Sequence, residues 1–316
     1  MKILANDGID AAGKAMLEAA GFEIETNKIP QEELSQKISA FDVLVVRSAT
    51  RVNASVLEAG NLRLVARAGV GLDNIDTARA RELGVPVINT PESASRSVAE
   101  LVMAHLYSLA RYLPLCNRDM PENGMQEFNS IKKTASSGFE LQGKKMGIIG
   151  FGRIGQELAR LAIGNGMEVL YFDPNCESAE LEFAIHPVYH GSPIRIELTS
   201  SSLQQLLEKS DVISIHSPGS QQVIGANEFS MMRKGICLLN CARGGAVDEE
   251  ALLKSLDNGQ VAFAGIDVFA SEPPKDDRLL RHPRVSLSPH IGASTKEAQE
   301  RVGTELAEKI IAHFRK

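Results

Sequence analysis

Three glycines, Gly150, Gly152 and Gly155, stand in G-x-G-x-x-G spacing between a short apolar run and a helical pattern. A strand, a glycine turn and a helix in this order let the backbone approach a pyrophosphate, which the free N–H groups of the helix start bind. The spacing alone is also typical of an ordinary glycine-rich turn. A second apolar strand at 168–172, with Asp173 at its end, favours a dinucleotide, because an acid there binds the adenosine ribose hydroxyls. That carboxylate repels a 2′-phosphate, so the sequence predicts NAD as the cofactor.

Polar residues in the second half could supply the acid–base chemistry of hydride transfer to that cofactor. A histidine such as His290 can take a hydroxyl proton near neutral pH, and a carboxylate such as Glu272 can orient the imidazole. A guanidinium such as that of Arg243 can hold a substrate carboxylate with two parallel hydrogen bonds. Since the chain has seven histidines, residue types alone leave this assignment open.

Two further arginines, Arg47 and Arg67, follow the apolar runs 43–46 and 62–66 in the first half. The carboxyl ends of parallel strands meet at one edge of a sheet, where open α/β folds bind their ligands. The matched positions favour an anionic substrate held in the cleft between two domains. The alternative is a pair of solvated surface charges.

The cysteines and several other histidines are interpreted as structural rather than catalytic or metal-binding residues. Cys241 is interpreted as a buried structural thiol, although a reactive thiol is the alternative. His105, on the apolar face of a long predicted helix, is interpreted as a core histidine with satisfied nitrogens. His186 and His190 have the spacing of a helical metal pair, but Pro187 between them favours a surface loop. The four cysteines form no C-x-x-C pair, and no metal site is predicted.

The elements that must position these residues alternate between strand and helix over the first ninety residues, and the whole chain has the pattern of two α/β units in tandem. This alternation predicts an α/β fold of two doubly wound parallel-sheet domains. The long amphipathic helix is predicted at 95–112. The polar, poorly periodic segment 117–138 is predicted to be a loop or a short helix, and 194–198 to belong to an extra strand pair.

Composition narrows the class of protein. The length of 316 residues suggests two domains, and 43% hydrophobic residues is normal for a globular protein. A net charge of −6 without a basic block argues against a nucleic-acid partner. No apolar run is long enough to span a bilayer, and the N-terminus does not look like a signal peptide, so no membrane association and a cytoplasmic location are expected.

Several runs resemble the signatures of the D-isomer-specific 2-hydroxyacid dehydrogenases, over essentially the whole chain. They are NCARGGAVDEEAL around Arg243, GIDVFASEPP around Glu272, SPHIGAST around His290, GFGRIG and SVAEL. The resemblance implies that Arg243 binds the substrate carboxylate, that His290 is the acid–base and that Glu272 is its partner.

The same resemblance implies that one domain binds the substrate and the other binds the cofactor. A discontinuous, flavodoxin-like substrate-binding domain is expected at 1–91 and 289–316, and a Rossmann NAD-binding domain at 92–288. The cofactor contacts are expected from Gly150, Gly152, Arg153, Ile154, Gly155, Asp173, His216, Pro218, Cys241, Ala242 and Asp267, with Asp267 holding the nicotinamide amide. The substrate contacts are expected from Arg47, Ser48, Arg67, Ala68, Gly69 and Val70.

Within the family, the runs VVRSAT and ARAGVGLDNID are most similar to D-3-phosphoglycerate dehydrogenases. This similarity implies oxidation of D-3-phosphoglycerate, in serine biosynthesis, with Arg47 and Arg67 on the substrate phosphate. One alternative is reduction of hydroxypyruvate, glyoxylate or another 2-oxo acid. An alternative of another class is an NAD(H)-sensing protein like the family's corepressors. A homodimer or homotetramer is expected, with the helix from Ser95 at the interface.

Three departures from the family pattern stand out. Ser93 and Ala94 replace the common glycine–asparagine pair, and the run HSPGSQQ lacks a threonine expected near the cofactor. The sequence ends at Lys316, so the C-terminal regulatory domain of many phosphoglycerate dehydrogenases, and feedback through it, are not expected.

Overall fold

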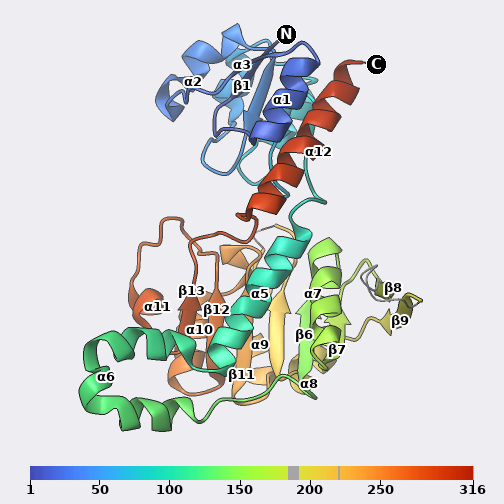
Figure 1. Ribbon diagram of the computed structural model, residues 1–316. Coiled ribbons are helices and arrows are strands. Elements are labelled where there is room, and N and C mark those ends of the chain that lie inside the picture. The colour runs from blue at the N-terminus through green and yellow to red at the C-terminus, as the bar shows by residue number, and fades with distance from the viewer. Residues whose placement is uncertain (184–191, 220, 316) are drawn as a thin grey trace. The chain divides into compact units, whose positions relative to one another are not determined.

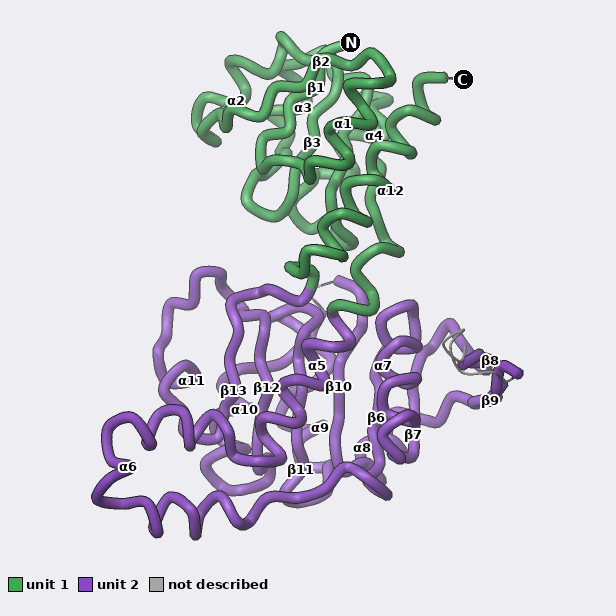
Figure 2. The backbone as a smooth tube through the Cα atoms, in the orientation of Figure 1, with its two compact units in different colours: residues 1–97, 293–316 green, residues 98–292 purple. Residues whose placement is uncertain are grey.

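The computed structural model describes residues 1–183, 192–219 and 221–315. The backbone divides into two compact units, coloured separately in Figure 2. The first comprises Met1–Ser97 and Ala293–Lys316, and the second Val98–Gly292. The chain therefore leaves the first unit and returns to it a few residues beyond the predicted borders after 91 and 288.

The first unit is built on a five-stranded, all-parallel sheet in the order β2-β1-β3-β4-β5. This is the flavodoxin-like order. Its strands are β1 (Lys2–Ala5), β2 (Glu23–Glu25), β3 (Val43–Val46), β4 (Leu64–Arg67) and β5 (Val87–Asn89). Its helices are α1 (Ala11–Ala19), α2 (Gln31–Lys37), η1 (Ile38–Ala40), α3 (Ala54–Ala59), α4 (Thr77–Glu82) and α12 (Lys296–Phe314).

Apolar side chains cover both faces of this sheet. Alternate residues of a strand point to opposite faces, so Ile3 and Leu4 of β1 lie in different core clusters. The cluster of Ile3 also contains Leu306 and Ile310 of α12. The last helix therefore completes one face of a sheet formed by the first ninety residues.

Helix α12 is also bonded to the last residue of β5 and to the segment that follows it. Ser93 Oγ donates to the carboxylate of Glu305, and Arg301 Nε donates to Ser93 O at 3.1 Å. Lys309 Nζ donates to Asn89 O at 2.9 Å. Ser93, one of the departures from the family pattern, thus joins this segment to α12.

The second unit carries a six-stranded parallel sheet in the order β13-β12-β11-β10-β6-β7 (Figure 1). Its strands are β6 (Lys145–Ile149), β7 (Glu168–Phe172), β10 (Val212–Ile215), β11 (Ile236–Asn240), β12 (Val261–Ile266) and β13 (Val285–Leu287). Its helices are α5 (Ser95–Ala110, which begins in the first unit), α6 (Leu113–Ala135), α7 (Arg153–Gly164), α8 (Leu203–Lys209), α9 (Ala226–Met231), η2 (Gly244–Ala246), α10 (Glu249–Asp257) and α11 (Arg278–Arg281). The predicted fold class, two doubly wound α/β domains, is confirmed.

Helices cover both faces of the second sheet. One core cluster joins Leu106 of α5 and Leu158 of α7 to Ile148 of β6. The other joins Leu206 of α8 and Leu252 of α10 to strands β10 and β11. The predicted extra strand pair is the antiparallel hairpin of β8 (Ser178–Phe183) and β9 (Ile194–Thr199).

The predicted loop or short helix at 117–138 is wrong, because the structure has the 23-residue helix α6 there. Only Ile131 of this helix is buried, so no apolar stripe marks it in the sequence. Pro121 lies inside it, and Glu127 has a non-helical φ of −112°, where the helix bends (Figure 1). Met125 and Phe128 of α6 are 94% and 52% exposed. Among the described residues, no helix is long and apolar enough to cross a membrane.

Candidate active site

The carboxyl ends of the parallel strands in the second unit bring most of the predicted residues to one edge of the sheet. Gly150 follows β6, Asp173 follows β7, and His216 follows β10. Cys241, Ala242 and Arg243 follow β11, Asp267 follows β12, and His290 lies three residues after β13. This edge is where open α/β sheets bind their ligands.

The glycine loop after β6 has the shape that a pyrophosphate needs. Gly150 has φ +91°, and a Cβ on it would lie 2.7 Å from His216 C. A Cβ on Gly155 would collide with Gly150 O, so the helix α7 packs closely on the turn. At Gly152 a Cβ would meet nothing within 4 Å, which leaves the backbone open to a ligand. The start of α7, with Arg153 and Ile154, therefore fits the phosphates of a dinucleotide.

Asp173 lies at the rim of this loop. Its Oδ2 accepts a hydrogen bond from Phe151 N at 2.7 Å, and its Oδ1 accepts one from Asn175 N at 2.8 Å. These two bonds fix the carboxylate beside the glycine turn. The position fits an acid that binds the two ribose hydroxyls and rejects a 2′-phosphate.

Buried polar atoms at the end of β10 complete the fit to a cofactor. His216 Nε2 lies 2.9 Å from Ser214 Oγ. Within the described part of the chain, His216 Nδ1 and Ser217 Oγ have no hydrogen-bond partner although both are buried. Because buried polar groups are normally bonded, these atoms fit a site that a polar ligand completes. Pro218 follows them and is exposed.

The acid sensitivity of the fold should depend on His216. Burial lowers the pKa of His216 from 6.5 to about 4. Between these values the unfolded chain takes up a proton that the folded protein does not, so stability falls as the pH falls below about 6.5. At about pH 5, the proton uptake by His216 in the unfolded chain has lowered the free energy of unfolding by about 2 kcal/mol.

Urea denaturation of wild type and His216→Gln at about pH 7 and about pH 5 measures this difference. The variant should lose about 2 kcal/mol less unfolding free energy than wild type on acidification. Equal losses would show that His216 titrates in the folded protein as it does in the unfolded chain.

The segment after β11 is held by Asn240, which is almost fully buried. Its Nδ2 donates to Arg243 O at 2.9 Å, and its Oδ1 accepts from Ala242 N at 3.2 Å. Arg243 Nη1 also donates to Ala242 O at 2.7 Å. The guanidinium is therefore bonded to a backbone segment that Asn240 holds in place. Cys241 is buried, and burial raises the pKa of its thiol, which supports the structural interpretation of this cysteine.

His290 and Glu272 form a bonded pair, with 2.7 Å between His290 Nδ1 and Glu272 Oε2. The side chains of both residues are about 40% exposed. A carboxylate can only accept hydrogen bonds, so Nδ1 carries the proton of the neutral ring. The lone pair of the neutral imidazole is then on Nε2, which makes this nitrogen the base of the pair.

Asp267 holds the loop that carries His290. Its Oδ1 accepts from Ile291 N at 2.9 Å and its Oδ2 accepts from Gly292 N at 3.0 Å. His290 N also donates to Asp267 O at 2.8 Å. These bonds support His290 in a left-handed conformation with φ +56°, which is costly for a residue with a side chain.

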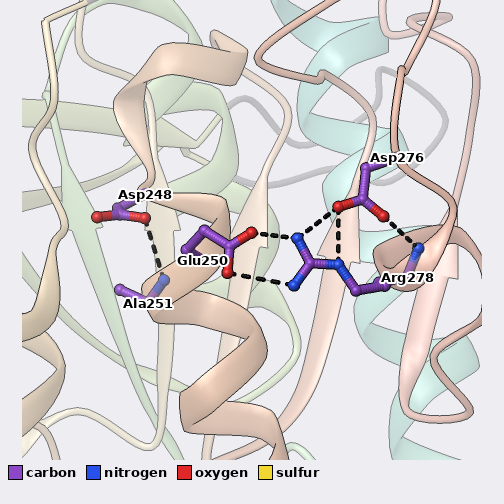
Figure 3. A network of polar contacts seen from close by, with 5 residues as sticks. All are labelled: Asp248, Glu250, Ala251, Asp276 and Arg278. Atoms are coloured by element: carbon purple, nitrogen blue, oxygen red, sulfur yellow. Dashed lines mark hydrogen bonds and ion pairs between the residues drawn. The ribbon is translucent and has the colours of Figure 1, made fainter.

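Contacts with η2 and α10 position the segment that carries Glu272. A Cβ on Gly244 would collide with Phe269 O, so the backbones approach very closely there. Ala270 N donates to Glu249 Oε1 at 2.7 Å. Figure 3 shows Arg278 between the carboxylates of Glu250 and Asp276. These last pairs are exposed and contribute little stability, so the backbone contacts position the loop.

In the first unit, Arg67 is the last residue of β4 and Arg47 is the first residue after the neighbouring strand β3. Val46, at the end of β3, pairs with Arg67 in the sheet. The side-chain amide of Asn74 bonds to both arginines. Arg67 Nε donates to Asn74 Oδ1 at 3.1 Å, and Asn74 Nδ2 donates to Arg47 O at 2.8 Å and Thr50 O at 2.7 Å. Asn74 therefore connects the two arginine-bearing segments.

A carboxylate and a glycine shape the same region. Asp7 Oδ2 accepts from Arg47 N at 2.8 Å and from Thr50 N at 3.0 Å. Gly69 has φ +151°, and a Cβ on it would lie 2.5 Å from Arg67 Nη1. The guanidinium thus lies against a residue that has no side chain. Of the other predicted contacts, Ser48 and Val70 are exposed and Ala68 is half-buried.

Sequence reasoning missed Asn74 and Asp7. Both are polar residues in loops, where no periodic pattern marks them, although the N-D-G triplet around Asp7 is a recognisable turn signal. The predicted surface loop with His186 and His190 lies outside the described residues. Among the residues that are described, no group of three His, Cys, Asp or Glu side chains could hold a metal.

The chain is similar to proteins of one oxidoreductase family. Residues 103–292 match the family model for the NAD-binding domain of D-isomer specific 2-hydroxyacid dehydrogenases. A hydroxypyruvate reductase of Thermotoga maritima is 40% identical, over 98% of this chain and 97% of that protein. A D-3-phosphoglycerate dehydrogenase of Methanocaldococcus jannaschii is 38% identical over 98% of this chain, which spans only 57% of that protein.

A solved structure extends the similarity to the fold. The NAD+-bound 3-phosphoglycerate dehydrogenase of Entamoeba histolytica is 25% identical, with a TM-score of 0.78. The match covers all of this chain and 95% of the other.

Proposed function

Because the chain belongs to the D-isomer specific 2-hydroxyacid dehydrogenases, and is thus an NAD-dependent oxidoreductase, we propose that it oxidises D-3-phosphoglycerate to 3-phosphohydroxypyruvate. The reaction would serve serine biosynthesis. The observation that carries the proposed chemistry is the bond of 2.7 Å between His290 Nδ1 and Glu272 Oε2.

His290 takes the hydroxyl proton in this proposal. The substrate hydroxyl donates to His290 Nε2, and the proton moves to that nitrogen as the C–H bond breaks. Glu272 stabilises the imidazolium that forms, because its carboxylate accepts from Nδ1. In the reverse direction, His290 returns the proton to the carbonyl oxygen.

Arg243 holds the substrate carboxylate and places the reacting carbon near His290. Its planar fork can donate two parallel hydrogen bonds, and its charge favours the polarised C–O bond of the transition state. A bound NAD would supply the acceptor for the hydride that leaves the substrate carbon. Gly150, Gly152 and the start of α7 would hold its phosphates, Asp173 its ribose, and Asp267 its nicotinamide amide.

The phosphate assignment depends on Arg47 and Arg67. Guanidinium groups bind phosphate well in a fixed geometry, and Asn74 bonds to Arg67 Nε and to Arg47 O. Rates with D-3-phosphoglycerate and D-glycerate, each with NAD, test the assignment. Equal or faster turnover of D-glycerate would contradict the phosphate site and leave the dehydrogenase chemistry intact.

Replacement of Asn74 by alanine should reduce this selectivity. The change removes three hydrogen bonds that position Arg67 and the turn after Arg47. We expect KM for D-3-phosphoglycerate to rise about tenfold, which corresponds to one or two hydrogen bonds, with little change for D-glycerate. Asn53→Ala is the matched control, because Asn53 caps α3 in the same unit. A similar KM rise for both substrates would contradict the role of Asn74 in selectivity.

The second candidate is a hydroxypyruvate or glyoxylate reductase. It is favoured by the Thermotoga maritima relative, whose length this chain almost fully covers. Oxidation of NADH with hydroxypyruvate, glyoxylate and 3-phosphohydroxypyruvate distinguishes the two candidates. NADH binding without turnover of any acid would favour the NAD(H)-sensing alternative.

A further inference from the structure

His105 on α5 belongs to a buried polar cluster with Ser286, Ser288 and Asp267. Its side chain is 4% exposed, and both ring nitrogens have partners, which confirms the predicted core histidine. Nδ1 lies 2.8 Å from Ser286 Oγ, and Nε2 lies 2.9 Å from Ser288 Oγ. A Cβ on Gly265 would lie 2.9 Å from His105 Cβ, so β12 leaves room for this residue.

The hydrogen-bond partners determine which atom donates at each step. Ser288 Oγ donates its only proton to Asp267 Oδ1 at 2.5 Å, because a carboxylate cannot donate. Ser288 must then accept from His105 Nε2. His105 Nδ1 is left without a proton in the neutral ring, so Ser286 Oγ donates to it. Burial lowers the pKa of His105, against an opposing effect of Asp267, and this favours the neutral ring.

This chain of bonds ends on the carboxylate of Asp267, the residue proposed to hold the nicotinamide amide. Asp267 Oδ1 is occupied by Ser288 Oγ and Ile291 N, and Oδ2 accepts from Gly292 N. An oxygen with two lone pairs and one donor can accept one more bond. Because Ser288 holds Oδ1, the direction of the remaining lone pair on Oδ2 is fixed.

We infer that His105 is a positioning residue for cofactor binding, which acts through Ser288 to orient the Asp267 carboxylate toward the nicotinamide amide. The inference rests on the proposed role of Asp267. Ser288 could otherwise rotate its hydroxyl away, and the carboxylate would lose a charge-assisted bond. The imidazole prevents this rotation because it supplies the donor that the serine oxygen must accept. His290, two residues after Ser288, belongs to the same loop.

NADH binding to the full chain tests this inference without any substrate. His105→Leu removes the donor to Ser288, and its dissociation constant for NADH should rise about fivefold. Ser288→Ala removes the bond to the carboxylate and should raise it about tenfold. His105→Gln keeps a donor for Ser288 and an acceptor for Ser286, and should restore affinity to within about twofold of wild type. Ser255→Ala is the control, since Ser255 is buried in the same unit and bonds only Ala251 O among the described residues.

Thermal unfolding of each variant separates positioning from packing. Weaker NADH binding by His105→Leu, rescued by glutamine, with unchanged binding by Ser255→Ala, supports the inference. Unchanged NADH binding by a folded His105→Leu or Ser288→Ala would overturn it, even if melting temperatures fell. Asp267→Asn, measured in parallel, keeps the proposals distinguishable. If it binds NADH as wild type does, the proposed role of Asp267 fails, whereas weakened binding in this variant alone contradicts only the role of His105.

Discussion

Replacement of His290 by asparagine should lower kcat about 10³-fold, within the range for loss of a general acid–base. The variant keeps a polar side chain but has no group that can take the hydroxyl proton. NADH affinity should change less than about twofold, because the proposed role of His290 is proton transfer with the substrate and not binding of the cofactor. Stopped-flow oxidation of NADH with the preferred oxo acid measures the rate, and fluorescence titration measures the affinity.

Glu272→Gln provides the graded comparison for this experiment. Glutamine keeps an oxygen that can accept from His290 Nδ1 but removes the negative charge. The rate should fall less than in the histidine variant, because His290 can still transfer the proton but its imidazolium is less stabilised. A histidine variant that keeps more than about a tenth of the rate would contradict the acid–base assignment.

Replacement of Arg243 by glutamine should lower kcat/KM about 10⁴-fold. The change removes a charge and a bidentate donor that act on the carboxylate and on the developing charge in the transition state. Arg243→Lys keeps the charge without the planar fork, and a loss of about 10²-fold is expected. Steady-state kinetics with the preferred acid and with its amide separate the two contributions. If the amide is turned over as well as the acid by wild type, Arg243 does not bind a carboxylate.

Much of the fold is predictable because buried parallel strands are continuous apolar runs. The predicted strand at 168–172 coincides with β7, and the apolar run 43–46 coincides with β3. Helix α6 is the main error, because helices that bury a single side chain carry no periodic signal. Helices α9, α10 and α11 were not predicted, and α9 and α11 are only six and four residues long.

The candidate site is predictable where strand ends position it. His216 and Asp267 follow β10 and β12 directly, and both reach the edge that carries the glycine turn. The residues that position the site side chains through hydrogen bonds are not predictable in this way. His105 and Ser288 are bonded across 183 residues of sequence, and Asn74 bonds to Arg47 O from the next loop. Such pairs are set by tertiary packing, which spacing along one sequence does not encode.

The return of α12 to the first sheet has a consequence for biosynthesis. Residues 98–292 form one uninterrupted stretch, so the second unit can fold while the nascent chain is still being extended. The core of the first unit cannot be completed until α12 has been synthesised. Leu306, Ala307 and Ile310 of this helix cover a face of the sheet, and Gly303 lies against Gly13. The segment that the ribosome makes first, residues 1–97, therefore belongs to the unit whose core is completed last.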